Sequence, residues 1–147
     1  MSSLFQTLLP FADTLLRVAT GLALLPHGLR NTFGFFPNTG VRALSVAELA
    51  KQLDADGYRP GAFWARAISL MQLIGGPLLA LGLFTRPIAA IVLMFLLVAD
   101  YERWRVGGYF WNKLGAEYTL MWTIATFVVL VHGGGTYSLD HLIGWSF

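Results

Sequence analysis

The sequence predicts an all-α integral membrane protein, built as a four-helix bundle with a short amphipathic helix in its first loop. Only 12% of the 147 residues are charged and 56% are hydrophobic, whereas soluble domains carry roughly 25% charged residues. Apolar stretches near the length of about 20 residues that a bilayer-crossing helix needs recur along the chain. A chain of this length is expected to form one transmembrane domain, residues 1–147.

Four apolar stretches are expected to form membrane helices. The second is the clearest, because residues 67–85 contain no charged side chain. Only four residues, Phe84 to Pro87, join it to the third, so these two helices are expected to form an antiparallel hairpin. The predicted spans cover about residues 8–30, 63–85, 87–104 and 113–133.

The long first loop contains a predicted helix of its own over about residues 46–53. Ser45 and Glu48 have the spacing of a capping box, in which two side chains bind backbone N–H groups at a helix start. The apolar residues that share one face of this helix are Val46, Leu49, Ala50 and Leu53. Two placements stay open: the helix lies on the membrane surface, or it covers the bundle as a lid.

Basic residues indicate the orientation in the membrane. Most of them lie in or beside the first and third loops, and only Arg86 lies on the opposite side. The positive-inside rule then places these loops in the cytoplasm and both termini outside it. Asp13 and Arg17 interrupt the first apolar stretch, which no basic segment precedes, so we expect a retained anchor. The chain is expected to be a multi-pass protein of a bacterial inner membrane.

The composition also excludes several kinds of chemistry. The chain has no cysteine, which excludes disulfides, thiolate zinc sites and dithiol electron transfer. Its net charge of +2 forms no basic stripe, so a nucleic-acid partner is not expected. The three histidines have no ligand-like spacing, so no metal site is expected.

Each predicted helix carries one polar side chain at a similar depth, roughly 8–10 Å from the bilayer midplane by the rise per residue. This predicted polar layer consists of His27, Arg66, Asp100 and Glu117. Polar groups in hydrocarbon are costly, so these four side chains are expected to face the bundle interior. Three interpretations stay open: structural ion pairs, a pocket for a lipid headgroup or quinone-like ring with proton exchange, and a contact with a partner protein.

A second polar group is predicted nearer the other side of the membrane. Asp13 and Arg17 are four residues apart on one helix face, which is the spacing of an ion pair. Arg17 lies deeper and needs a further acceptor, for which Gln72 or a backbone carbonyl could serve. Gln72 lies near Gly75 and Gly76, two small residues that let helices approach closely.

Short motifs follow one another through nearly the whole chain outside the first loop. They are Arg17 and Gly21, then His27-Gly28 with Arg30, then GGPLLALGLFTR at residues 75–86, then Glu117, and finally GGGTYSLD at residues 133–140. Their order and spacing resemble the DoxX family of small four-helix membrane proteins. One departure is Gln72, where that family commonly has a glutamate, because a glutamine cannot exchange a proton near pH 7.

The resemblance implies a supporting role in redox chemistry. DoxX-like proteins are associated with quinone-linked membrane oxidoreductases and with complexes that contain oxidative-stress enzymes. The chain would then be a membrane subunit without catalytic activity of its own, with quinone as its one suggested cofactor. The implied partners are the lipid bilayer, other membrane subunits and further copies of the chain. The alternatives are a purely structural or anchoring subunit and, less favoured, a small transporter of a lipophilic solute.

Overall fold

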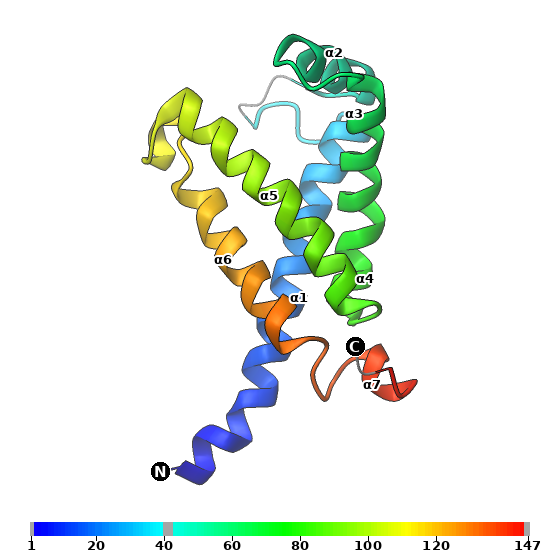
Figure 1. Cartoon of the computed structure of the whole chain (residues 1–147), viewed down its shortest axis with the longest axis vertical. Helices are drawn as coiled ribbons and strands as arrows, with labels where there is room; N and C mark the ends of the chain where they lie inside the picture. Colours follow the sequence, from blue (N-terminus) through cyan, green and yellow to red (C-terminus); the bar gives the residue numbers. More distant parts are fainter. Residues whose placement is uncertain (1, 40–42, 146–147) are drawn as a thin grey trace. The chain divides into compact units, whose positions relative to one another are not determined.

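In a computed structural model of the chain, residues 2–39 and 43–145 are described, and this part is helical without a strand. Two of its helical stretches are long and apolar enough to cross a membrane, Ser3–Phe33 and Gly61–Leu81, and Glu117–His132 is a shorter apolar helix. The elements, drawn in Figure 1, are α1 (Ser2–Phe33), α2 (Val46–Ala55), α3 (Gly61–Leu70), the π-helical turn η1 (Met71–Gly75), α4 (Gly76–Leu81), α5 (Thr85–Gly107), the 3-10 turn η2 (Trp111–Lys113), α6 (Glu117–His132) and α7 (Leu139–Leu142).

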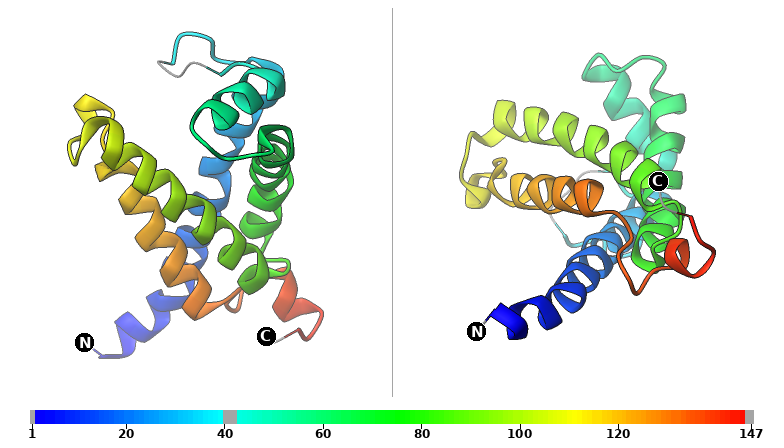
Figure 2. Two further views of the ribbon diagram at one scale, coloured as in Figure 1. Left: turned by 45° about the horizontal axis from the view of Figure 1, so that its top comes forward. Right: turned by 60° about the horizontal axis from the view of Figure 1, so that its bottom comes forward.

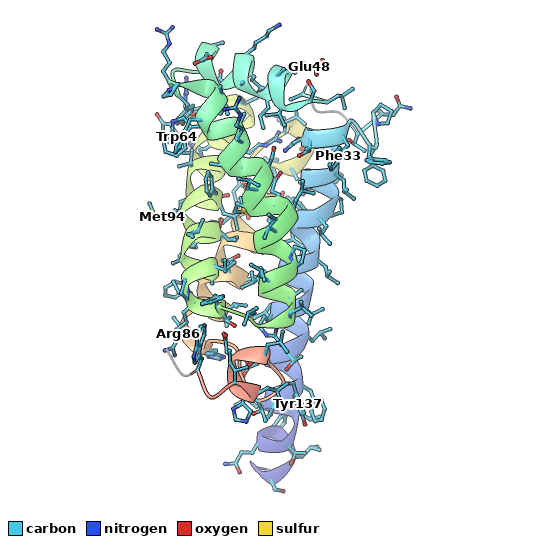
Figure 3. The ribbon with its side chains drawn as sticks, turned by 90° about the vertical axis from the view of Figure 1, so that its right-hand side faces the viewer. Phe33, Glu48, Trp64, Arg86, Met94 and Tyr137 are labelled. Atoms are coloured by element: carbon cyan, nitrogen blue, oxygen red, sulfur yellow. The ribbon has the colours of Figure 1, made fainter. Side chains whose placement is uncertain are left out.

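The chain divides into two compact units. Unit 1 consists of Met1–Thr20 and Leu78–Phe147, and unit 2 consists of Gly21–Pro77. In unit 1, α5 and α6 lie side by side as an antiparallel pair, which both views of Figure 2 show. Leu79, Ala89 and Val129 form the buried core of this unit. The outer face of α5 is apolar, and Met94 points away from it with 70% of its surface exposed (Figure 3).

In unit 2, α2 and α3 pack against each other, and side chains cap the start of both helices. The predicted capping box is present: Ser45 Oγ accepts from the Glu48 N–H at 3.2 Å, and Glu48 Oε2 accepts from the Leu44 N–H at 2.8 Å. Asp54 Oδ1 then accepts from the Gly61 N–H at 2.7 Å and caps the start of α3. The predicted loop helix is therefore present, two residues longer than expected at its C-terminal end.

The helix that follows α3 contains a wide turn just before Pro77. The Gly76 N–H donates to the Met71 carbonyl, five residues back, so η1 is a π-helical turn. Pro77 has no N–H, and its ring would collide with the carbonyl four residues earlier in a regular α-helix. The wider turn gives that ring room and places Gln72 on a local bulge, a feature that is frequent at functional sites.

Small residues let α1 approach this bulged helix within unit 2. A Cβ added at Gly28 would lie 2.9 Å from Gln72 Cβ, and one at Gly76 would lie 2.7 Å from the Gly21 carbonyl oxygen. Real Cβ atoms do not come this close, so the contact requires glycine at both positions. The expectation that Gly76 permits close helix packing is confirmed.

Candidate functional site

The most organised polar cluster in unit 1 surrounds Arg17. Its side chain is only 2% exposed, and it extends from α1 to the carbonyl groups at the end of α4. Arg17 Nη1 donates to the carbonyls of Leu79, at 3.1 Å, and of Ala80, and Nη2 donates to the carbonyl of Tyr137 at 2.7 Å. The last carbonyls of a helix have no partner within that helix. One guanidinium thus joins α1, the end of α4 and the segment before α7.

This arrangement of Arg17 depends on a glycine in the turn after α4. Gly82 has a φ of +70°, and a Cβ there would lie 2.5 Å from Ser138 Cβ and 2.6 Å from Arg17 Nη1. Tyr137 lies beside α1 in Figure 3, with its ring centroid 5.2 Å from that of Phe11. The segment before α7 is therefore held against both α1 and the turn.

Asp140 in α7 caps the start of α5. Its Oδ1 accepts from the Phe84 N–H at 2.8 Å, and its Oδ2 accepts from the Thr85 N–H at 2.8 Å and from the Thr85 hydroxyl at 2.7 Å. Figure 2 shows α7 beside the turn that leads into α5. Helices need side-chain acceptors for their first N–H groups. Phe84 occupies the position where α5 would carry its own cap and has no acceptor, so a distant residue takes that role.

Replacing Asp140 with asparagine is expected to lower the free energy of unfolding by about 2 kcal/mol, the contribution of one hydrogen bond to a charged group. An amide offers one acceptor oxygen, and its NH₂ group would face a backbone N–H that also donates. The measurement is thermal unfolding of the purified protein in detergent, followed by tryptophan fluorescence. Asp56→Asn is the matched control, because Asp56 is exposed at the end of α2. Equal melting temperatures for the two variants would contradict the capping role.

Asp13, Arg17 and Gln72, which form the second predicted polar group, do not bind one another in the structure. Asp13 Oδ1 lies 2.9 Å from Nδ1 of His132 at the end of α6 and does not pair with Arg17. Of the two further acceptors considered for Arg17, the structure shows backbone carbonyls. Gln72 belongs to unit 2, where its Oε1 accepts from Asn31 Nδ2 at 3.1 Å.

A buried polar chain runs through unit 2 from this glutamine. Asn31 Oδ1 accepts from Arg30 Nη2 at 3.0 Å, and Arg30 and Asn31 are 8% and 7% exposed. Arg30, Asn31 and Gln72 therefore connect α1 to the π-helical turn by side-chain hydrogen bonds. His27 precedes Asn31 by one turn of α1, and its side chain is exposed. His27, Arg30 and Gln72 stand out in the sequence, whereas the role of Asn31 between Arg30 and Gln72 is visible only in the structure.

The predicted polar layer has two members in each unit: His27 and Arg66 in unit 2, Asp100 and Glu117 in unit 1. Arg66 is exposed on α3. Asp100 Oδ2 lies 2.6 Å from the hydroxyl of Thr123 on α6, and Glu117 Oε2 accepts from the Trp111 N–H at 3.2 Å. Each side chain thus has its own local surroundings, and the layer as a single site stays a prediction.

A metal centre has no donor set in the described ranges, 2–39 and 43–145. No group of three or more histidine or carboxylate side chains that could hold a metal ion occurs there. The polar side chains that a ligand could contact are instead single residues on otherwise apolar helices. Asp100 Oδ1 is buried without a hydrogen-bond partner in the described part of the chain.

A comparison with models of protein families shows the family to which the chain belongs. The DoxX family model matches residues 12–101. No curated protein sequence and no solved structure matches the chain. The matched range covers more than half of the chain and includes Arg17, Gln72 and Gly82, so the resemblance to DoxX is confirmed. With the two apolar helices long enough to cross a bilayer, the match identifies the chain as a small membrane protein that belongs to the DoxX family.

Proposed function

We propose that the chain is a non-catalytic subunit of a quinone-linked oxidoreductase complex in a bacterial inner membrane. Four membrane passes, α1, α3 to α4, α5 and α6, would form a bundle with both termini outside the cytoplasm. Two of these stretches have the length and hydropathy of spans, and the basic loops favour this orientation. The subunit would offer a surface to a lipophilic ligand, and a partner subunit would carry the redox centre.

The observation that carries this proposal is the polar edge of α1 in unit 2. His27 is exposed there, one turn before the buried chain of Arg30, Asn31 and Gln72. A quinone has carbonyl oxygens that accept hydrogen bonds and a long apolar tail. Ligand sites of this kind combine apolar walls with a few well-placed polar groups. The imidazole of His27 can donate to a carbonyl and can exchange a proton near neutral pH.

The other members of the predicted polar layer are further candidate ligand contacts, each within its own unit: Arg66 in unit 2, and Asp100 and Glu117 in unit 1. Asp100 has a carboxylate oxygen without a donor, and no hydrogen bond or ion pair engages Arg66 among the described residues. Glu117 has one carboxylate oxygen on the Trp111 N–H. Ionisable side chains in membrane helices are functional candidates because their burial in hydrocarbon is costly.

Replacing His27 with alanine is expected to lower the quinone retained by the purified protein about threefold to tenfold, the effect of one hydrogen bond. The measurement is quinone extracted from detergent-purified protein and quantified per mole of chain. His141→Ala is the matched control, because His141 is exposed in the short helix α7 of unit 1. Unchanged quinone in H27A would overturn the role of His27.

A purely anchoring role is the second candidate, and the polar contacts of unit 1 favour it. Arg17 and Asp140 are engaged in joining helix ends, so their presence needs no ligand. The same extraction separates the two candidates. Wild-type protein that co-purifies with a larger complex but contains no quinone would support the anchoring role and contradict the ligand.

A further inference from the structure

Arg66 lies between two apolar grooves in unit 2. One groove, of about 450 Å³, lies between α2 and α3 and is lined by Val46, Ala47, Ala50, Ala62 and Arg66. The other, of about 400 Å³, follows α3 and is lined by Pro60, Ala62, Phe63, Arg66, Ala67 and Leu70. Ala62 and Arg66 belong to both grooves and are exposed, one helical turn apart.

The only charge in these two grooves is positive and comes from one side chain. Arg66 is the only ionisable residue that lines either of them, and every other lining residue is apolar. No hydrogen bond or ion pair engages its guanidinium within residues 2–39 and 43–145. An unpaired cation with apolar walls on both sides is complementary to an amphiphile that has an anionic head and an apolar tail.

Arg66 lies near the loop end of its expected membrane span, from which a long side chain can reach the headgroup region. The helix starts at Gly61, directly after a polar loop that contains Asp56 and Arg59. Arg66 is five residues further on, about 7.5 Å along the axis at 1.5 Å per residue. An arginine at this depth can extend its head toward the lipid phosphates while its stem stays on apolar surface.

We propose that Arg66 binds the phosphate of an anionic phospholipid, with one acyl chain lying in the groove along α3. The guanidinium presents a planar set of donors that matches a phosphate, and phosphate contacts of this kind are stronger than neutral hydrogen bonds. The groove runs from Pro60 to Leu70, about 15 Å of helix, which accommodates most of an acyl chain. This site shares Arg66 with the predicted polar layer, but its grooves contain neither His27 nor Gln72.

The test is native mass spectrometry of the full-length protein in detergent, titrated with phosphatidylglycerol or with phosphatidylcholine. Wild-type protein is expected to retain one phosphatidylglycerol in preference to phosphatidylcholine. Arg66→Gln is expected to lower that retention about tenfold, the effect of one charge-assisted hydrogen bond. The matched control is Arg59→Gln, which removes an exposed cation that lines neither groove. The quinone content is measured in the same samples, so that loss of lipid and loss of quinone are recorded separately, and R59Q is expected to change neither.

A second variant tests the groove without changing its charge. Ala62→Leu adds volume at the residue shared by both grooves and is expected to lower phosphatidylglycerol retention while Arg66 stays in place. Equal retention by wild-type protein and R66Q would overturn the proposal, and so would equal retention of the two lipids. Displacement of the lipid by millimolar inorganic phosphate would also overturn it, because the site would then bind the anion without the acyl chain.

Discussion

Replacing Gly82 with alanine is expected to destabilise the protein far more than the same replacement at Gly135. Both glycines have a φ of +70°, so an alanine at either position has the same unfavourable left-handed backbone, at a cost of roughly 1–2 kcal/mol. At Gly135 a Cβ would meet no atom within 4 Å. At Gly82 it would lie 2.5 Å from Ser138 Cβ and 2.6 Å from Arg17 Nη1, which adds overpacking.

Overpacking of a well-packed site costs about 1–3 kcal/mol, so the total loss for G82A is expected to be about 3 kcal/mol or more. The measurement is the free energy of unfolding in mixed micelles at increasing SDS fraction, followed by circular dichroism. G135A is expected to lose only the backbone cost. Because the two variants share the positive φ and the residue type, their difference reports the contact with Arg17 and Ser138. Indistinguishable unfolding curves would show that this contact is not close in the folded protein.

The features that the sequence predicted well are local ones. The capping box of Ser45 and Glu48 is present because both of its hydrogen bonds join residues at most four apart. A short turn does join the second and third apolar stretches, but it lies at residues 82–84, slightly before the expected Phe84 to Pro87, since α4 ends at Leu81 and α5 begins at Thr85. Helix periodicity, caps and turn residues act over a few neighbours, so they can be read without knowing the fold.

The features that the sequence did not predict join distant residues. Asp140 caps α5 at Thr85, 55 residues away, and neither residue carries a local signal of that contact. The one indication in the sequence was a missing cap. Phe84 has no side-chain acceptor, so the start of α5 required an acceptor from elsewhere in the chain. Asn31 was missed because an asparagine in an apolar helix gains its role only when Gln72, on another helix, comes within hydrogen-bond distance.

Asp13 illustrates why the i,i+4 rule named the wrong partner. The rule describes an isolated helix, in which Arg17 would be the nearest cation to Asp13. In unit 1 the carbonyls of Leu79, Ala80 and Tyr137 take up the Arg17 guanidinium, while Asp13 pairs with His132. Three hydrogen bonds from one guanidinium to backbone carbonyls outweigh a local ion pair, which contributes only about 0.2–0.5 kcal/mol in a helix.

Replacing Arg17 with methionine is therefore expected to lower the free energy of unfolding by about 3–5 kcal/mol, because the carbonyls of Ala80 and Tyr137 each lose a hydrogen bond to a charged group, which contributes about 1.5–3 kcal/mol. Methionine fills a similar volume along the stem, and the Leu79 carbonyl keeps the Gly82 N–H as a donor at 3.1 Å. Arg17→Lys is expected to recover part of the loss, because an ammonium keeps the charge but lacks the planar fork. The same SDS titration in mixed micelles measures both variants.

The control on the same helix is Thr20→Val. Thr20 is also 2% exposed, but its hydroxyl donates to the Leu16 carbonyl within α1, at 2.7 Å. Removing that bond is expected to change the free energy of unfolding by less than about 1 kcal/mol, because it joins no second element. If R17M were no less stable than T20V, Arg17 would not hold α1 to the end of α4 and the segment before α7. Arg17, which is part of the family motif, would then be available to a ligand. That result would favour a functional role for Arg17 over a structural one.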